Sequence, residues 1–414
     1  MIFDKLSKDS KIILKNFSYL SLMRVFNIGF KLFLVAYLVR VLGQNNYGLV
    51  TWLDSVIQYF LMVINFGFNI YAAKYIVDYK EENKKINEIV SSIYSIKTLL
   101  FVFSLVVIIC LSFLNDFNAY KEALILFAFC GIGEVLFPIW YFQGKENLKP
   151  ATVIVFFSRL LLVVGVLFFV TTTNNVIEYI AILVLSSLVM GVFGAGYIYK
   201  YYDLKFTLIP LKKLSKYIKE AFPFFLGRFL SLVFNFGTIF LIGKYCEYQQ
   251  VSGFDVCLKI IMVSVIPFEM LQQAVFPTLA RTRDKKLLKK LVIGSFVLGI
   301  VAGLIIFLLS DTLIFLFGGK DMLDYVETLH VLTILAPFVA LTFILGSCSL
   351  VAFGYYREYN ISLIGTSVVY MLILIVLYWF DLINFWSLVY LRVFGDVLMC
   401  FVRLYYSVKR KILV

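Results

Sequence analysis

Charged residues are scarce in this sequence. They make up 15% of its 414 residues, whereas hydrophobic residues make up 62%, and the mean hydropathy is +0.94. Soluble domains are about half apolar and about a quarter charged. A chain of this composition has more apolar surface than a soluble core can bury. We therefore exclude the soluble classes and expect an all-α polytopic membrane protein.

Histidine is nearly absent, and the cysteines are not paired in sequence. His330 is the single histidine, and the six cysteines form no C-x-x-C pair and fall mostly within apolar runs. This pattern supports neither a disulfide framework nor a metal site. The sequence also lacks a G-x-x-x-x-G-K-[ST] loop, a D-x-D motif and a Ser/His/Asp grouping. We therefore expect neither an enzyme nor a bound cofactor.

Apolar runs long enough to cross a bilayer recur along the whole chain. Because each crossing needs roughly 20 residues, we predict about twelve spans. They cover residues 16–42, 48–72, 94–115, 121–142, 151–172, 176–200, 219–243, 250–275, 291–317, 325–353, 358–380 and 385–407.

The loops between these spans alternate in charge. Basic loops, such as Lys200 to Lys219, alternate with short polar or acidic loops, such as "FDLIN". Since basic loops stay in the cytoplasm, we expect an even number of spans with both termini cytoplasmic. The formal net charge of +13 fits this rule and contact with anionic lipid. No nucleic-acid partner is expected.

The two halves of the sequence resemble each other weakly. Arg24 in the first span aligns with Arg228 in the seventh, and "YGL" at Tyr47 aligns with "SGF" at Ser252, both at an offset of about 205 residues. Internal repeats of this kind are typical of transporters. We predict two parallel six-helix bundles at 1–200 and 219–414. A basic cytoplasmic linker at 201–218 joins them, and its amphipathic pattern is typical of an interfacial helix.

Polar residues within two predicted spans follow helical spacing. The stripes consist of Ser21, Arg24, Asn27 and Lys31 in the first span and of Arg228, Ser231 and Asn235 in the seventh. A lone arginine at this depth fits a snorkelling or structural role as well as a functional one. Two equivalent stripes favour a wet cavity, because charge facing lipid is not compensated. The candidate substrate-binding residues are Arg24, Asn27, Lys31, Arg159, Arg228 and Asn235.

Carboxylates also fall within the predicted spans. Asp255 and Lys259 are spaced i, i+4, as are Arg392 and Asp396; both pairs fit simple neutralisation, which we favour for the second. Acids beside a cavity are candidate sites for proton or Na⁺ coupling. The four candidates are Asp54, Glu134, Asp255 and Glu269. For His330, near a span end, a capping or interfacial role is favoured over a proton relay.

A cationic cavity between two membrane bundles predicts an anionic substrate. Guanidinium groups donate paired hydrogen bonds to phosphate oxygens and keep their charge at any accessible pH. An anion held at membrane depth indicates a phosphate- or pyrophosphate-linked lipid.

Three motifs carry a resemblance to a known family. They are "YLVRVLGQNNYG" at Tyr37 to Gly48, "INFGFNIYAAKYI" from Ile64, with Asn65 where an aspartate is expected, and "WYFQGKE" at Trp140 to Glu146. In this order they resemble the Wzx-type polysaccharide flippases. That family lies in the superfamily of multidrug, oligosaccharidyl-lipid and polysaccharide exporters, which also includes the peptidoglycan-precursor flippases.

The resemblance implies a protein of the bacterial inner membrane. It implies a flippase for undecaprenyl-pyrophosphate-linked oligosaccharide units, as in O-antigen and lipopolysaccharide biosynthesis, that works by alternating access and is coupled to protons or Na⁺. It also implies a cationic lumen for the pyrophosphate, with Arg24 and Arg228 as the first residues carried over. Membrane lipids and the polysaccharide polymerase machinery are the further partners it suggests, and we expect a monomer.

Several alternatives stay open. An exporter of small molecules or drugs shares the fold, but organic cations need acidic or aromatic pockets, and the buried charge here leans basic. A flippase for another lipid-linked glycan precursor would bind the same pyrophosphate, although the peptidoglycan subgroup generally has additional helices. Enzymes acting on lipid-linked sugars form a different class, and the short outer loops leave no catalytic domain. A channel would leave the duplicated stripes unexplained.

Overall fold

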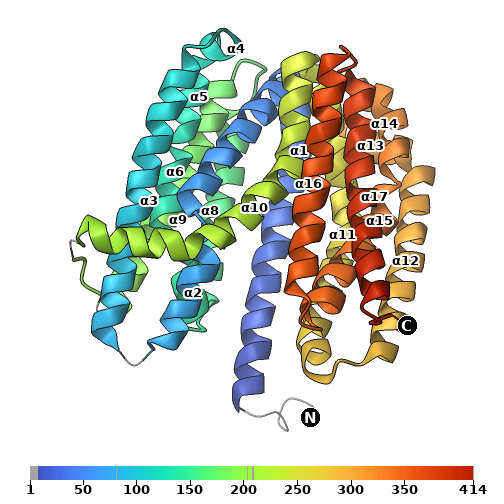
Figure 1. Cartoon of the computed structure of the whole chain (residues 1–414). Coiled ribbons are helices and arrows are strands. Elements are labelled where there is room, and N and C mark those ends of the chain that lie inside the picture. The colour runs from blue at the N-terminus through green and yellow to red at the C-terminus, as the bar shows by residue number, and fades with distance from the viewer. Residues whose placement is uncertain (1–7, 81, 203, 208, 414) are drawn as a thin grey trace. The chain divides into compact units, whose positions relative to one another are not determined.

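The computed structural model describes residues 8–80, 82–202, 204–207 and 209–413. Within two helices, some side chains also lie outside the described part: those at 8–18, 20–21, 24–25, 27–28, 211–212, 227–228, 230–231 and 233–235. The described residues form helices and no strand (Figure 1). In the first half of the chain these are α1 (Lys8–Asn65), α2 (Phe68–Asp78), α3 (Asn83–Ser112), α4 (Asn115–Asn118), α5 (Lys121–Ala128), α6 (Cys130–Leu136), α7 (Ile139–Gly144), α8 (Lys149–Phe169) and α9 (Val176–Tyr201).

The second half continues the all-helical pattern. Its elements are α10 (Leu211–Tyr245), α11 (Tyr248–Thr282), α12 (Lys285–Leu308), α13 (Ser310–Gly318), the 3₁₀-helix η2 (Lys320–Tyr325), α14 (Val326–Leu332), α15 (Leu335–Phe343), the π-helix η3 (Ile344–Val351), α16 (Tyr356–Trp379) and α17 (Phe385–Lys409).

Many of these helices are built for a bilayer. Among the described residues, nine are long and apolar enough to cross a membrane, and the bent pair Lys320–Leu332 and Leu335–Val351 brings the number to ten. Large apolar side chains such as Phe168 and Leu308 are exposed on them, at 75% and 77%. The predicted all-α polytopic membrane class is confirmed. The count of about twelve spans and the cytoplasmic placement of both termini stay predictions.

The predicted first and second spans are joined in one long helix, α1. At Gly43 its backbone leaves the helical region, with φ 76° and ψ 167°. Glycine adopts such positive φ values at little cost because it has no Cβ. A second break follows α1, where Phe66 and Gly67 have φ values of 46° and 76° before α2 begins.

The chain folds into two compact units. The first comprises Met1–Leu34 and Val56–Phe229, and the second comprises Val35–Ser55 and Leu230–Val414. The middle of α1 therefore packs with the second half of the chain, which a division by sequence position does not anticipate. The predicted boundaries of bundles and linker stay a prediction.

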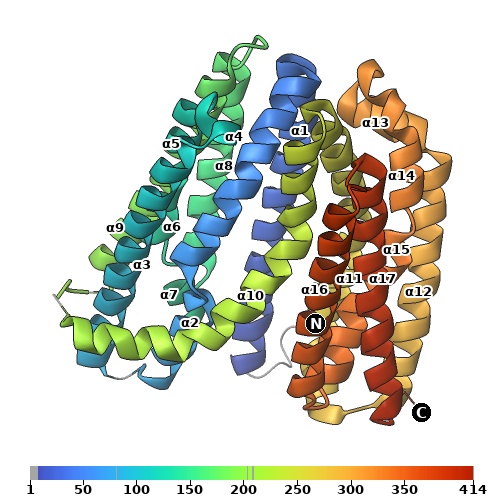
Figure 2. The ribbon, with the colours of Figure 1, turned by 45° about the horizontal axis from the view of Figure 1, so that its top comes forward.

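In the first unit, α9 packs along α6 and α8, α7 packs along α2, and α3 packs along α5 and α6. Fully buried aromatic residues such as Trp140, Phe142 and Phe68 form the core where α2, α3 and α7 meet. The first part of α10 crosses α2 and α3 near their ends, as both ribbon views show (Figures 1 and 2). This crossing places a helix from the predicted linker against the base of the first unit.

In the second unit, α15 is the central helix. It packs against α11, α12 and α17, and α16 packs along α17. Gly299 of α12 allows a close approach, since a Cβ there would lie 2.6 Å from the Cα of Pro337. The π-helix η3 follows α15 directly and packs against α11 and α17.

Candidate functional site

The first unit contains a polar network in the middle of a broken membrane helix. The segment predicted as one span at 121–142 is divided into α5, α6 and α7, with breaks at Phe129 and at Phe137 and Pro138. Proline has no amide hydrogen, so Pro138 cannot donate to the carbonyl oxygen four residues earlier, which belongs to Glu134. A carbonyl left without a donor at membrane depth must be satisfied by a side chain or by water.

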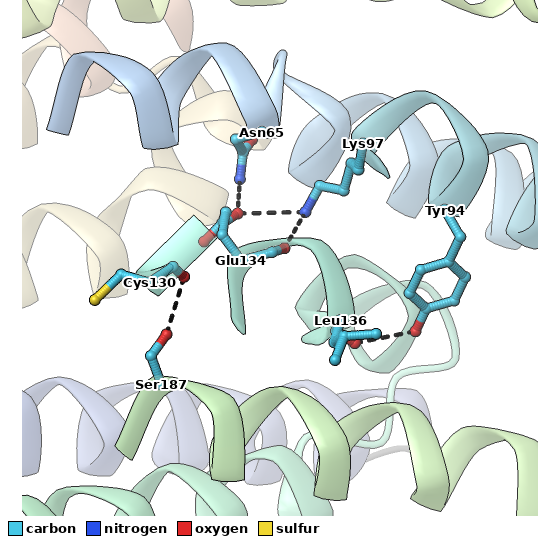
Figure 3. A network of polar contacts seen from close by, with 7 residues as sticks. All are labelled: Asn65, Tyr94, Lys97, Cys130, Glu134, Leu136 and Ser187. Atoms are coloured by element: carbon cyan, nitrogen blue, oxygen red, sulfur yellow. Dashed lines mark hydrogen bonds and ion pairs between the residues drawn. The ribbon is translucent and has the colours of Figure 1, made fainter. Parts of the chain in front are cut away.

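Lys97 of α3 supplies that donor. Its ammonium lies 2.8 Å from the backbone carbonyl oxygen of Glu134 and 3.3 Å from Oε1 of the same residue (Figure 3). The Lys97 side chain is fully buried, whereas 30% of the Glu134 side chain is exposed. Because an unpaired buried ammonium costs several kcal/mol, the carboxylate is required to neutralise it. Lys97 is thus held by both the backbone and the side chain of one residue.

Asn65, at the end of α1, completes the surroundings of Glu134. Its Nδ2 donates to Oε1 of Glu134 at 2.6 Å (Figure 3). One carboxylate oxygen therefore receives two donors, while no donor among the described residues reaches Oε2. Asn65 is the position where the resemblance led us to expect aspartate. An aspartate would face Glu134 with a second negative charge, so the amide fits this network better.

Two more side chains bind the backbone of the broken helix. The Tyr94 hydroxyl donates to the carbonyl oxygen of Leu136, and the Ser187 hydroxyl donates to that of Cys130, both at 3.1 Å (Figure 3). Gly133 lets α9 come close, since any Cβ there would collide with the backbone of Ser187. The helix break is therefore supported from both α3 and α9.

The second unit contains a cluster between the middle of α1 and the start of α11. Lys259 Nζ donates to Tyr47 Oη at 2.7 Å, and the Tyr47 hydroxyl donates to Oδ2 of Asp255 at 2.6 Å. Lys259 also forms an ion pair with Asp255, which confirms the pairing predicted from the i, i+4 spacing. The Asp255 carboxylate is buried, and it is neutralised by a lysine, as the half-buried Glu134 is in the first unit.

Residues next to Tyr47 in the same motif hold α1 and α11 together. A Cβ on Gly48 would collide with the carbonyl group of Tyr248, so only glycine allows the helices to approach this closely. The Ser252 hydroxyl donates to the carbonyl oxygen of Gln44, which lies about one helical turn before Gly48. In the aligned halves, Gly48 corresponds to the "SGF" segment at Ser252, so equivalent parts of the repeat contact each other.

Arg40 of the same motif caps another helix. Its guanidinium donates to the carbonyl oxygens of Phe315 and Leu316 at 2.9 and 2.7 Å, near the end of α13. Cations near a helix C-terminus satisfy its last carbonyl groups and oppose the helix dipole. Arg40 is therefore a structural cation within this unit.

Three further carboxylates predicted from the sequence are those of Asp54, Glu269 and Asp396. Asp54 and Glu269 are half-buried, and Gln273 donates to Glu269 at 3.4 Å. Arg392 and Asp396 form an ion pair at 3.2 Å, which confirms the predicted neutralisation in α17.

The predicted cationic residues are only partly described. The side chains of Arg24, Asn27, Arg228 and Asn235 lie outside the described residues. Lys31 is exposed on α1, and Arg159 is half-buried on α8. The convergence of these residues on one anion stays a prediction. His330 shares a hydrogen bond of 2.8 Å with Ser310 at the start of α13.

Two buried cations were missed by sequence reasoning. Lys97 has no acid at helical spacing, although Pro138, four residues after Glu134, signals a carbonyl that needs a donor. Arg403 of α17 is buried and donates to the carbonyl oxygen of Thr342 at 2.8 Å. No sequence pattern marks the partner of Arg403, because the two residues meet only in the packed unit.

The model of the polysaccharide biosynthesis protein family matches residues 13–283. The chain belongs to this family. Among curated proteins, it is 23% identical over 369 residues to a "Putative O-antigen transporter" of Escherichia coli (strain K12), covering 87% of this chain and 88% of that protein. A second protein with the same description, from Shigella dysenteriae, is 22% identical over 394 residues, covering 93% and 97%.

Solved structures show which fold this family member shares. The lipid II flippase MurJ in an inward closed conformation matches with a TM-score of 0.76 at 16% identity, covering 94% of this chain and 87% of that one. An inward-facing multidrug resistance MATE family transporter of the MOP superfamily matches with a TM-score of 0.72 at 15% identity, covering 92% and 94%. The family match and the curated relatives confirm the resemblance to polysaccharide exporters, and the solved structures show that the chain shares their fold with other transporters. The curated relatives are described as putative transporters, which supports the expectation that the chain is not an enzyme.

Proposed function

We propose that this protein translocates undecaprenyl-pyrophosphate-linked oligosaccharide from the cytoplasmic to the periplasmic leaflet of a bacterial inner membrane. Family membership and the O-antigen transporters that match most of the chain support a lipid-linked glycan as the cargo. The expected cycle is alternating access of the two halves, with the pyrophosphate bound by Arg24 and Arg228. Lys31, Arg159, Asn27 and Asn235 are the supporting candidates.

The observation that carries the anionic cargo is the pairing of membrane carboxylates with built-in lysines. Glu134 is neutralised by Lys97, and Asp255 is neutralised by Lys259. An exporter of organic cations needs carboxylates that can accept the cargo's charge. Two of the four candidate acids are already committed to a lysine, which favours an anionic cargo over a cationic drug.

The test is a host deleted for this gene and complemented with variants. We expect the deletion to accumulate lipid-linked oligosaccharide facing the cytoplasm and to lose surface polysaccharide, with rescue by the wild type. Arg24→Ala/Arg228→Ala should not rescue. The control Arg281→Ala/Arg357→Ala removes two exposed arginines and should rescue fully. Normal surface glycan combined with altered drug sensitivity in the deletion host would instead support the exporter function.

We further propose that transport is coupled to protons through Glu134. The Glu134 side chain is 30% exposed and no donor among the described residues reaches its Oε2, so this oxygen is the one proposed to take up the proton. In proteoliposomes, Glu134→Gln should abolish the acceleration that a pH gradient produces. Glu122→Gln, an exposed glutamate at the start of α5, is the matched control. A response to a Na⁺ gradient that survives in Glu134→Gln would contradict this assignment.

The remaining partners are proposed on the family expectation. A monomer is the expected state, and the polymerase machinery that extends the polysaccharide is an expected neighbour. Co-purification of the full chain from membranes solubilised in mild detergent, with its mass measured by light scattering, tests both.

A further inference from the structure

The start of α10 is an amphipathic helix docked on the first unit. We call residues 211–226 the linker helix, because this segment contains the end of the predicted linker at 201–218 and the first residues of the predicted seventh span. Leu214 and Ala221 are buried in the core of the first unit, and the rings of Phe225 and Phe66 stack at 4.6 Å. A Cβ on Gly67 would lie 2.8 Å from the backbone nitrogen of Phe225. One side of the linker helix is therefore fixed against the break between α1 and α2.

The single carboxylate of the linker helix belongs to this inner side. Glu220 accepts hydrogen bonds from the hydroxyls of Tyr71 and Tyr75 in α2, at 2.5 and 2.7 Å. Its negative charge is thus turned toward α2 and held there by two donors. No other acid occurs between Leu211 and Leu226.

The outer side carries the opposite charge. Lys213, Lys216 and Lys219 are exposed and follow one another at a spacing of three residues, which keeps them near one face of a helix. Lys213 lies 2.9 Å from Glu88, yet its side chain is still 58% exposed. Folding has therefore separated the charges, with the acid inside and the lysines outside.

Apolar residues follow the lysines on the exposed part of the linker helix. Phe222, Phe224 and Leu226 have 48%, 38% and 40% of their surface exposed. In a membrane protein, a helix that crosses the ends of spans runs along the bilayer surface. Exposed lysines together with exposed apolar side chains are typical of a helix that contacts both headgroups and acyl chains at that surface.

We propose that the linker helix is a binding surface for anionic phospholipid headgroups, contacted by Lys213, Lys216 and Lys219. Positive charge on an interfacial helix is attracted to the negative surface of the inner leaflet. The exposed Phe222 and Phe224 favour lipid over an acidic protein partner, because acyl chains cover them and a charged protein surface does not. This proposal is independent of the cargo, since Lys213, Lys216 and Lys219 are not among the candidate cargo-binding residues.

The test measures which lipids the full chain retains. Purified protein is exchanged into detergent micelles with equimolar phosphatidylglycerol and phosphatidylcholine, captured by an affinity tag and washed, and the bound lipids are quantified by mass spectrometry. The variant is Lys213→Gln/Lys216→Gln/Lys219→Gln. The matched control is Lys286→Gln/Lys289→Gln/Lys290→Gln, which removes three exposed lysines at the start of α12. Monodisperse elution confirms that each protein is folded.

We expect the wild type and the control to retain phosphatidylglycerol over phosphatidylcholine by at least about fivefold. The linker-helix variant should retain the two lipids nearly equally. If that variant does not fold, the test is the salt dependence of phosphatidylglycerol enrichment by the wild type. Binding to charged headgroups must weaken as salt is raised from low to high concentration. Equal enrichment in variant and wild type, or an enrichment in the wild type that is absent or insensitive to salt, overturns the proposal. So does an equal loss in the control, since it would reflect overall charge.

Discussion

The Lys97 ammonium lies 2.8 Å from the one carbonyl oxygen that Pro138 leaves without its helical donor, that of Glu134. Pro138 thus leaves the carbonyl group of Glu134 free to accept a hydrogen bond from a buried cation. The cation in turn requires a carboxylate, which the same residue provides. The helix break at Pro138, the freed carbonyl group of Glu134 and the Lys97–Glu134 ion pair therefore depend on one another.

Breaking this pair should destabilise the protein strongly. We expect Lys97→Met to lower the free energy of unfolding by about 3 kcal/mol, because it leaves the Glu134 carboxylate without its counter-charge and the Glu134 carbonyl group without its donor. Adding Glu134→Gln to Lys97→Met should recover part of the loss, since the carboxylate that has lost its counter-charge is removed. Thermal unfolding in detergent measures both. Losses that simply add in the double variant would show that the two residues do not act as a pair.

The Tyr47 hydroxyl should matter for stability despite its small size. Tyr47→Phe removes one donor from the buried carboxylate of Asp255 and one acceptor from Lys259. We expect a loss of about 2 kcal/mol, which is typical of a hydrogen bond to a charged group. Tyr356→Phe, at a tyrosine with 62% of its surface exposed, is the control and should change the unfolding temperature little. Equal unfolding temperatures for the two variants would contradict the role of the cluster.

Glycine at position 48 should be irreplaceable for packing reasons. Gly48→Ala places a Cβ on the carbonyl group of Tyr248, so α1 and α11 must move apart. We expect a loss of about 1 to 3 kcal/mol, as for other overpacked contacts. Gly294→Ala is the matched control, because nothing lies within 4 Å of its Cβ position. It should be neutral or slightly stabilising, since alanine is the better helix former.

The hydrogen bonds of Glu220 should hold the linker helix on the first unit. Tyr71→Phe/Tyr75→Phe keeps both rings but removes both donors to the carboxylate. We expect trypsin to cleave after the exposed Lys205 several-fold faster, because local opening exposes the preceding segment. Tyr201→Phe, which alters an exposed hydroxyl nearby, should leave the rate unchanged. Identical rates for all three proteins would show that the linker helix does not depend on these bonds.

The sequence predicted features that depend on local spacing. Apolar runs indicated the membrane class, and the i, i+4 rule found the Asp255–Lys259 and Arg392–Asp396 pairs. It could not find contacts that depend on packing between distant segments. Lys97 and Glu134 are 37 residues apart, and Tyr47 and Asp255 are 208 apart. Such pairs leave no periodic signal in a single sequence.

The pattern of apolar residues also could not predict where a helix is interrupted. The predicted span at 121–142 is three helices, and the one at 291–317 divides near Leu309 into α12 and α13. Hydropathy reports total apolar content, whereas breaks depend on single residues such as Pro138 and on side chains that satisfy freed carbonyl groups. The motif residues behave similarly. Arg40 caps α13 and Gly48 allows α1 and α11 to pack closely. Their place in a family motif does not reveal these roles.

The most direct test of the proposed function is transbilayer movement of undecaprenyl-pyrophosphate-linked oligosaccharide in proteoliposomes. Movement is followed by the accessibility of the glycan to an added glycosidase. We predict that wild-type protein and Arg281→Ala/Arg357→Ala move the lipid at the same rate. Arg24→Ala/Arg228→Ala should be slower by at least about tenfold, because each lost guanidinium–phosphate contact weakens binding of the anion. A double variant that moves the lipid as fast as the wild type would contradict the account.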